Sequence, residues 1–255
     1  MLRSLFVGIA LCVFLLLGSS SHASQLWGGR GPIRVDPHSG ATLGAVGGFN
    51  TNWLDAASDP VRSPATFWGI DYVENRLEEY DPNRDKLLRT IDADDADPIR
   101  SIAIDPSSGL LYAASETTLY RFDLGTGMQE TVGALSSDVT KSIGFSAGGE
   151  LYGFTSGNQL VAIDKSTSIA SSVATLGLRR VEDFAARPED GVVYGIAYTD
   201  LSYQLVTIDL AAGDFEYVGP SIVRPSYLAF VGVPEPAAVS LLLGLAGGVL
   251  LVRRP

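Results

Sequence analysis

The sequence predicts an all-β fold, a five-bladed β-propeller, from one repeat and the pattern within it. A motif of an apolar residue, an aromatic residue and a small residue recurs at intervals of 40 to 44 residues along the 255-residue chain. Alternating apolar stretches follow each copy, and turn residues separate them. Four short strands in a unit of about 42 residues are typical of a propeller blade, whose strands bury one face against the next blade.

The repeated motif marks one strand in each predicted blade. The five copies are Leu26-Trp27-Gly28, Phe67-Trp68-Gly69, Leu111-Tyr112-Ala113, Leu151-Tyr152-Gly153 and Val193-Tyr194-Gly195. The small residue after each aromatic is expected to let neighbouring blades approach closely. Five copies predict five blades, and a sixth blade would need a unit that the sequence does not show.

An alternating apolar strand that ends in aspartate follows each aromatic strand. A carboxylate before a turn can accept hydrogen bonds from backbone N–H groups two residues further on. Because the aspartates recur once per blade, we expect them to stabilise turns rather than to catalyse a reaction. They are Asp36, Asp81, Asp123, Asp164 and Asp209.

An inner strand opens the better-formed units, at 101–104, 142–145 and, less regularly, 183–186. The first unit has none, but residues 227–230 align with 101–104 and are predicted to complete the first blade, which pairs edges that would otherwise stay open. In the second unit we expect the inner strand somewhere in 50–57 and a longer loop over 58–66.

The repeat also resembles a broad class of bacterial propeller repeats, most clearly in the segment LYAASETTLYRFDLGTG. That class includes binding proteins and enzymes. The resemblance therefore implies the fold and leaves the function open.

The N-terminal end has the features of a secretory signal peptide over residues 1–23. Arg3 supplies its positive charge, and a nearly unbroken apolar run over 5–17 follows. Small residues precede the expected cut, so cleavage is predicted between Ala23 and Ser24. The protein is expected to be exported, and a retained N-terminal anchor is the alternative.

The C-terminal end carries a second apolar run, 237–252. Pro234, Glu235 and Pro236 stand just before it, and Arg253 and Arg254 follow it. The run is short against the roughly 20 residues that span a bilayer, but arginines at its end can snorkel to the interface. We therefore predict a transmembrane helix with a cytoplasmic C-terminus.

This order of features, behind an export signal, resembles the PEP-CTERM sorting signal over residues 233–255. That family is processed by exosortase, an integral-membrane enzyme of Gram-negative bacteria that also make exopolysaccharide. The resemblance implies a propeller domain at 24–232 between two processed ends. It also implies a cell-envelope or extracellular destination, with signal peptidase and exosortase as processing partners and membrane attachment through 237–252 before processing.

The composition argues against several classes of function. The chain has 18 basic and 29 acidic residues, a net charge of −11, and three of the basic residues lie in the terminal segments. This balance disfavours binding to nucleic acid or to an anionic membrane surface. The only cysteine, Cys12, lies in the signal peptide, so the domain has no disulfide and no thiolate site. No phosphate-binding glycine loop is visible, and no cofactor is expected.

Hydrolytic chemistry has few candidate groups. His38 is the only histidine outside the signal peptide, so a serine–histidine–aspartate triad or a multi-histidine metal site is not expected. Carboxylates remain, as in five-bladed glycosidases. The acids at or near inner strands are Asp55, Asp105 and Asp183, but no flanking motif supports them, and no catalytic residue is assigned.

The densest charge lies at 92–97. Its four aspartates could hold Ca²⁺ through oxygen ligands, but no glycine occupies the sharp turn and no glutamate follows at the expected distance. A solvated loop between two blades is the favoured interpretation, and no metal is assigned. The weak calcium candidates are Asp92, Asp94, Asp95 and Asp97.

The loops that enter the inner strands carry Arg100, Lys141 and Arg180. Such loops converge at one mouth of a propeller, where cations could receive an anionic or sugar ligand or could pair with acids such as Glu182. The sequence favours a non-enzymatic envelope or matrix protein that binds an envelope protein or a polysaccharide at this mouth. A carboxylate-dependent glycan hydrolase and a purely structural matrix component are the alternatives.

Overall fold

The computed structural model describes residues 24–28, 33–45, 52–59, 63–93, 97–136, 139, 142–199, 202–219 and 227–232. Residues Ser24–Val233 form one compact unit. The predicted signal peptide, the sorting motif and the apolar run 237–252 lie outside the described residues. Within the ranges described, no helix is long and apolar enough to cross a membrane.

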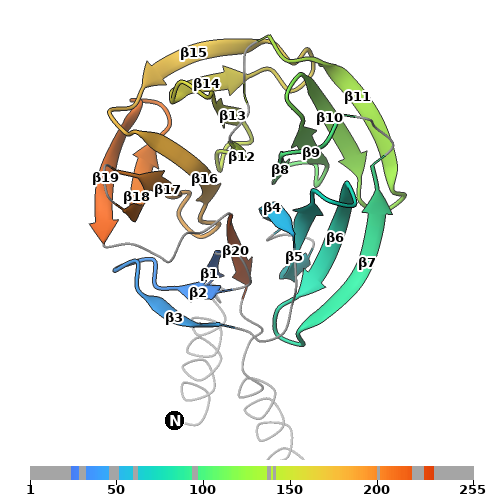
Figure 1. Cartoon of the computed structure of the whole chain (residues 1–255), viewed down its shortest axis with the longest axis horizontal. Coiled ribbons are helices and arrows are strands. Elements are labelled where there is room, and N and C mark those ends of the chain that lie inside the picture. The colour runs from blue at the N-terminus through green and yellow to red at the C-terminus, as the bar shows by residue number, and fades with distance from the viewer. Residues whose placement is uncertain are drawn as a thin grey trace, which may run out of the picture. The chain divides into compact units, whose positions relative to one another are not determined.

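The described residues form five sheets of four antiparallel strands, arranged as blades around a ring (Figure 1). Blade 1 contains β20 (Leu228–Gly232), β1 (Ser24–Gly28), β2 (Ile33–Val35) and β3 (Thr42–Ala45). Blade 2 contains β4 (Trp53–Asp59), β5 (Ser63–Asp71), β6 (Arg76–Asp81) and β7 (Lys86–Asp92). Blade 3 contains β8 (Ser101–Ile104), β9 (Leu111–Ala114), β10 (Thr118–Asp123) and β11 (Met128–Ala134).

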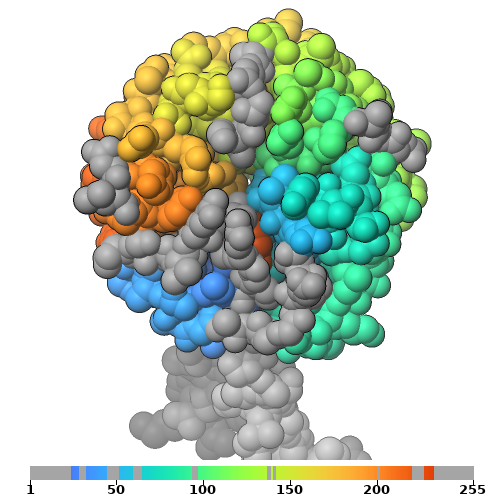
Figure 2. Space-filling model, in the orientation of Figure 1, coloured from blue at the N-terminus to red at the C-terminus, as the bar shows by residue number. Residues whose placement is uncertain are grey.

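The last two blades follow the same order from the centre outwards. Blade 4 contains β12 (Ser142–Phe145), β13 (Leu151–Phe154), β14 (Gln159–Ile163) and β15 (Ala170–Thr175). Blade 5 contains β16 (Arg180–Ala186), β17 (Val193–Tyr198), β18 (Tyr203–Asp209) and β19 (Asp214–Gly219). The space-filling view shows the blades in chain order around one face, from blue blade 1 to orange blade 5 (Figure 2). The predicted five-bladed propeller is confirmed.

The C-terminal strand closes the first blade, as predicted. Strand β20 pairs with β1 in antiparallel register, from Ser24 opposite Gly232 to Gly28 opposite Leu228. The innermost strand of this blade therefore comes from the end of the domain and the next strand from its beginning. This closure gives β1 a hydrogen-bonding neighbour on its inner side.

The second blade differs from the prediction. Residues 58–66 were expected to form a loop, but β4 continues to Asp59 and β5 begins at Ser63. The pairing of Ser58 with Phe67 and of Asp59 with Ser63 contains a register shift. Such irregularities interrupt the two-residue alternation by which a strand is recognised in a sequence.

The core consists of apolar layers between successive blades. Between blades 2 and 3, for example, Trp68 and Leu77 pack with Ile102 and Phe122. This arrangement follows from the two-residue period, since alternate side chains of each strand face the adjacent blade. The aromatic cluster between blades 1 and 2 contains Trp27, Trp53, Phe67, Tyr80 and Tyr227.

The small residue of the repeat has a different neighbour from the one expected. A Cβ added to Gly69 would lie 2.0 Å from the ring of Trp53, on the inner strand of the same blade. At Gly28 it would lie 2.7 Å from the backbone oxygen of Tyr227, just before the inner strand of that blade. At these two positions the glycine makes room for its own blade's inner strand.

Candidate functional site

The aspartates at the strand ends stabilise turns, as predicted. In every blade the carboxylate accepts a hydrogen bond from the backbone N–H two residues further on. The N–O distances are 2.9 Å for His38 to Asp36, 2.9 Å for Asn83 to Asp81, 2.8 Å for Gly125 to Asp123, 2.8 Å for Ser166 to Asp164 and 2.9 Å for Ala211 to Asp209. One contact repeated five times makes these residues part of the blade architecture.

The structure brings together two of the three inner-strand acids. The side chains of Asp55 on β4 and Asp183 on β16 lie close enough for each carboxyl to influence the pKa of the other. Each residue is 2% exposed. Asp105 follows β8 and instead pairs with Lys165 of blade 4, at 2.7 Å. The sequence singled out all three acids but gave no reason to join Asp55 with Asp183.

Polar side chains at the start of the inner strands connect one blade to the next. The Ser101 hydroxyl donates to Asp55 at 2.5 Å and accepts from the Ile143 backbone N–H at 2.7 Å. The Ser142 hydroxyl donates to Asp183 at 2.7 Å. We call Asp55, Ser101, Ser142 and Asp183 the channel ring. Sequence reasoning missed the two serines as site residues, although they align with Asp183 at the same position of their strands.

Backbone donors fill the remaining acceptor positions of the two carboxyls. Asp55 accepts from the Ile102 N–H at 2.7 Å and from the N–H of Ala56 at 2.7 Å. Asp183 accepts from the Phe184 N–H at 2.7 Å and from the N–H of Leu228 on β20. Together with the Ser142 hydroxyl on β12, these bonds connect the carboxyl pair to the inner strands of all five blades.

Burial is the largest single effect on the pKa of each carboxyl in this pair. Desolvation raises the pKa of Asp55 to about 6, against a partial opposing effect of its hydrogen bonds. Desolvation and then the charge of Asp55 raise the pKa of Asp183 well above its usual range. Two carboxyls in contact inside a protein cannot readily both ionise, so the pair keeps a proton to higher pH than an exposed aspartate does.

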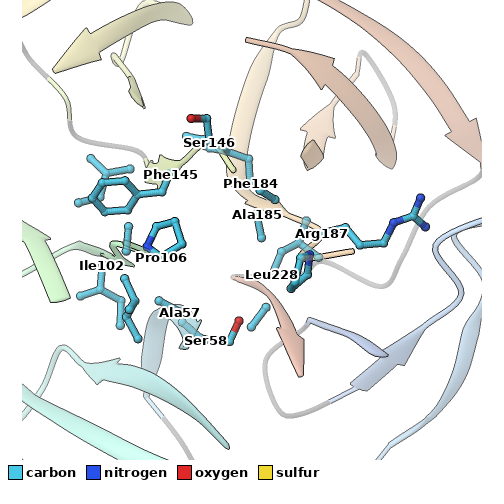
Figure 3. A pocket seen from close by; sticks show the side chains of 18 of the residues that line it. Ala57, Ser58, Ile102, Pro106, Phe145, Ser146, Phe184, Ala185, Arg187 and Leu228 are labelled. Atoms are coloured by element: carbon cyan, nitrogen blue, oxygen red, sulfur yellow. The ribbon is translucent and has the colours of Figure 1, made fainter. Parts of the chain in front are cut away.

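A cavity of about 410 Å³ begins one residue beyond the channel ring and is lined by all five inner strands. In Figure 3, Ile102, Pro106, Phe145, Ala185 and Leu228 surround it. Ser58 and Ser146 add hydroxyl groups, whereas Asp55 and Asp183 are absent from the lining. We call this cavity the channel pocket, and its wall is mainly apolar.

A cation at the rim is directed away from the channel pocket. The Arg187 side chain extends outwards in Figure 3, pairs with Asp190 and lies 5.3 Å from the ring centre of Tyr194. The wall of the channel pocket thus offers small hydroxyls and apolar groups, but no free carboxylate or cation among the residues described. Such a surface suits an uncharged apolar group better than an ionic ligand.

The cations of the predicted ligand mouth lie elsewhere. Arg100 and Arg180 are at the starts of the inner strands, and neither lines the channel pocket. Arg100 pairs with Glu116 at 2.6 Å. Arg180 pairs with Glu182, which matches the structural alternative raised from the sequence. Lys141 lies outside the described residues.

The acidic segment 92–97 is described only in part. Asp92 ends β7, while Asp94 and Asp95 lie outside the described residues. Asp97 accepts hydrogen bonds from the hydroxyls of Ser115 and Thr117. In the part of the chain that the structure describes, no group of three or more His, Cys, Asp or Glu side chains is placed to hold a metal ion.

Comparison with known proteins informs the fold alone. No family model matches the chain, and no curated protein matches it. A chain of a nidogen–laminin complex is 10% identical with a TM-score of 0.58, covering 82% of this chain and 98% of that one. Kuenenia stuttgartiensis hydrazine synthase is 15% identical with a TM-score of 0.47, covering 70% and 52%. The WD40 β-propeller domain of Doa1 is 15% identical with a TM-score of 0.47, covering 74% and 60%.

This chain therefore spans about half the length of the hydrazine synthase chain that it resembles. At these identities the likeness carries no information about ligands or chemistry.

Proposed function

We propose that this protein is an exported, non-enzymatic binding protein of the bacterial cell envelope. Its channel pocket receives an apolar group of a partner protein. The observation that carries the proposal is that the acids are separate from the cavity. The carboxyl pair is enclosed in structural hydrogen bonds, and the accessible wall presents apolar side chains and two serine hydroxyls but no carboxyl group.

The bonding of the carboxyl pair argues against glycan hydrolysis. A glycosidase needs two carboxyl groups that reach the scissile bond, one as acid and one as base or nucleophile. Asp55 and Asp183 are each 2% exposed and accept hydrogen bonds from backbone N–H groups and serine hydroxyls. Freeing either carboxyl for a substrate would leave buried donors without an acceptor, which costs about 1–3 kcal/mol for each group.

The lining of the channel pocket favours a protein partner over a polysaccharide. Sugar hydroxyls need many polar partners, and a buried hydroxyl without one is unfavourable. The wall supplies the hydroxyls of Ser58 and Ser146 against the side chains of Ile102, Phe145 and Leu228. A cavity of about 410 Å³ is large enough for one or two apolar side chains.

The two ends of the chain support export and sorting. Segment 1–23 has the features of a cleavable signal, and Pro234-Glu235-Pro236 stands before the apolar run 237–252 and Arg253-Arg254. We propose that signal peptidase and exosortase process the chain. The domain is then held by 237–252 at the inner membrane until the tail is processed, and afterwards remains in the envelope or is released.

Site-specific photo-crosslinking in cells tests the binding proposal. The photoreactive residue p-benzoylphenylalanine replaces Ser58 at the channel pocket of the full-length protein, in a bacterium that contains exosortase. We expect one discrete cross-linked protein that disappears when Ala185→Phe fills the channel pocket. The same photoreactive residue at exposed Met128 on β11 is the matched control and should not yield that product.

Two outcomes would overturn the proposal. One is a cross-linked product that persists in the Ala185→Phe variant, because the channel pocket would then not be the binding site. The other is glycan cleavage by the purified protein that Asp183→Asn abolishes, which would establish the hydrolase alternative.

A further inference from the structure

The first residue of the propeller is held by a carboxylate from the neighbouring blade. The Ser24 hydroxyl donates to Glu189 Oε2 at 2.8 Å, and the Ser24 backbone nitrogen donates to Glu189 Oε1. Ser24 begins β1 of blade 1, whereas Glu189 lies in the turn between β16 and β17 of blade 5. Both oxygens of one side chain thus bind one residue across the boundary between the first and last blades.

The turn that presents Glu189 is well defined. Arg187 forms two hydrogen bonds to Asp190, and the Gly191 N–H donates to the Arg187 carbonyl at 2.8 Å. Gly191 has a φ of 73°, a conformation that glycine adopts without strain. The Glu189 carboxylate therefore projects from an ordered turn.

The position of Ser24 matches the predicted cleavage site, and here the argument rests on the proposed export. Hydrolysis of the peptide bond between Ala23 and Ser24 consumes one water and leaves a carboxylate on Ala23 and an ammonium group on Ser24. That ammonium nitrogen is the atom that already donates to Glu189. We propose that Glu189 is the binding site for the mature N-terminus, and that signal cleavage replaces a hydrogen bond from a neutral amide donor with a salt bridge between blades 1 and 5.

The salt bridge would act at the closure of the ring. Ser24 also pairs with Gly232, the last residue of β20. The new charge therefore joins the first strand, the closing strand and the last blade at one point. An ammonium donor adds a charge–charge attraction to the existing hydrogen bond, so processing would tighten this closure.

Amine reactivity tests the inference. The full-length chain is expressed with its export signal, purified, and its N-terminus is identified by mass spectrometry. It is then treated at pH 7.5 with an amine-reactive ester, and acylation of the N-terminal amine is followed over time. An adjacent carboxylate favours the ammonium form, which does not react.

The variant Glu189→Gln keeps a hydrogen-bonding side chain and removes the charge. We expect its N-terminal amine to react several-fold faster than that of the wild type, because each pKa unit changes the neutral amine fraction about tenfold. Glu216→Gln, an equal change of charge on the exposed outer strand β19, is the matched control and should react at the wild-type rate.

The outcomes separate this inference from the proposed export. If the chain begins at Ser24 but Glu189→Gln reacts at the wild-type rate, the binding site is wrong and export stands. If the signal is retained or cut elsewhere, no ammonium group forms on Ser24. The inference then fails together with the predicted cleavage site.

Discussion

The aspartates of the channel and those of the blade turns accept similar hydrogen bonds but differ in protonation. Burial raises the pKa of Asp55 and of Asp183. At the surface, a hydrogen bond from the Ser39 hydroxyl lowers the pKa of Asp36, and one from the Ser166 hydroxyl lowers the pKa of Asp164. Hydrogen bonds alone therefore do not decide the charge. Removal from water outweighs them in the channel, and the charge of Asp55 adds to the rise for Asp183.

Asp105 lies between these two cases. It is 1% exposed, and burial by itself would raise its pKa. The hydrogen bonds from Lys165 and Ser107 outweigh burial and lower the pKa to about 2. A buried carboxyl thus stays ionised when a cation is its partner and retains a proton when another acid is its partner.

Asp183→Ala should have the largest effect. It removes the acceptor of the Phe184 and Leu228 N–H groups and of the Ser142 hydroxyl. Since each buried donor left unpaired costs about 1–3 kcal/mol, we expect the free energy of unfolding to fall by more than about 3 kcal/mol. Urea denaturation measures it. A loss no greater than that of Asp164→Ala would contradict the structural role of the channel ring.

The pH dependence of stability should be the next largest effect. The folded-state pKa of Asp55 is about 6, above the value of 3.8 for an unperturbed aspartate. The folded protein then binds more protons than the unfolded chain between these values. The stabilisation of the fold by this extra proton binding is complete below about pH 4 and declines as the pH rises through 6.

Because one pKa unit corresponds to about 1.4 kcal/mol, we expect the wild type to be less stable at pH 8 than at pH 5, by on the order of 2 kcal/mol. Urea denaturation at both pH values measures the difference. Asp55→Asn removes this titration and should reduce the difference, leaving the part that comes from Asp183. An unchanged slope in this variant would assign the pH dependence to other groups.

Lys165→Met should have a smaller effect with the opposite dependence on pH. Asp105 has a pKa of about 2 in the folded protein, so its ion pair stabilises above pH 4 and is lost as the pH falls towards 2. Lys165 is partly exposed, and we expect a loss of about 1 kcal/mol at pH 7. Denaturation at pH 7 and pH 2.5 tests this, since the difference between the two proteins should be clearly smaller at pH 2.5.

Asp164→Asn should change stability least. The amide oxygen can still accept from the Ser166 and Thr167 N–H groups of the exposed turn.

An NMR titration of the carboxyl carbons in the wild-type protein tests the comparison directly. Asp164 should titrate below the usual range for aspartate and Asp55 above it. Titration of both residues in the usual range would remove the distinction between channel and turn.

Much of the fold could be predicted from the sequence because it depends on local patterns. The aromatic repeat gave the blade number, and the likeness of 227–230 to 101–104 gave the closing strand. The prediction for the second blade was wrong at 58–66, where the strands continue through a register shift that breaks the alternation. A regular pattern is visible in a sequence, whereas an irregular strand is recognised only from its partner.

The site was less predictable because it depends on closure of the ring. Asp55 and Asp183 stand in different repeats and meet only when the blades assemble around the channel. The sequence placed cations such as Arg100 and Arg180 at one mouth, but it could not show that the cavity lies beyond the channel ring, among Ile102, Phe145 and Leu228. Strand periodicity tells which residues face a channel and not which end of the channel is open.

The split first blade also has a mechanical consequence. Tension on the chain beyond Gly232 acts along the axis of β20, whose five residues pair with five of β1. Hydrogen bonds between antiparallel strands run across the strand axis, so this tension loads them in shear and they resist together. The Leu228 N–H to Asp183 adds a fixed point in the neighbouring blade. A pull on the tail is therefore borne by the innermost strand and shared with blades 1 and 5.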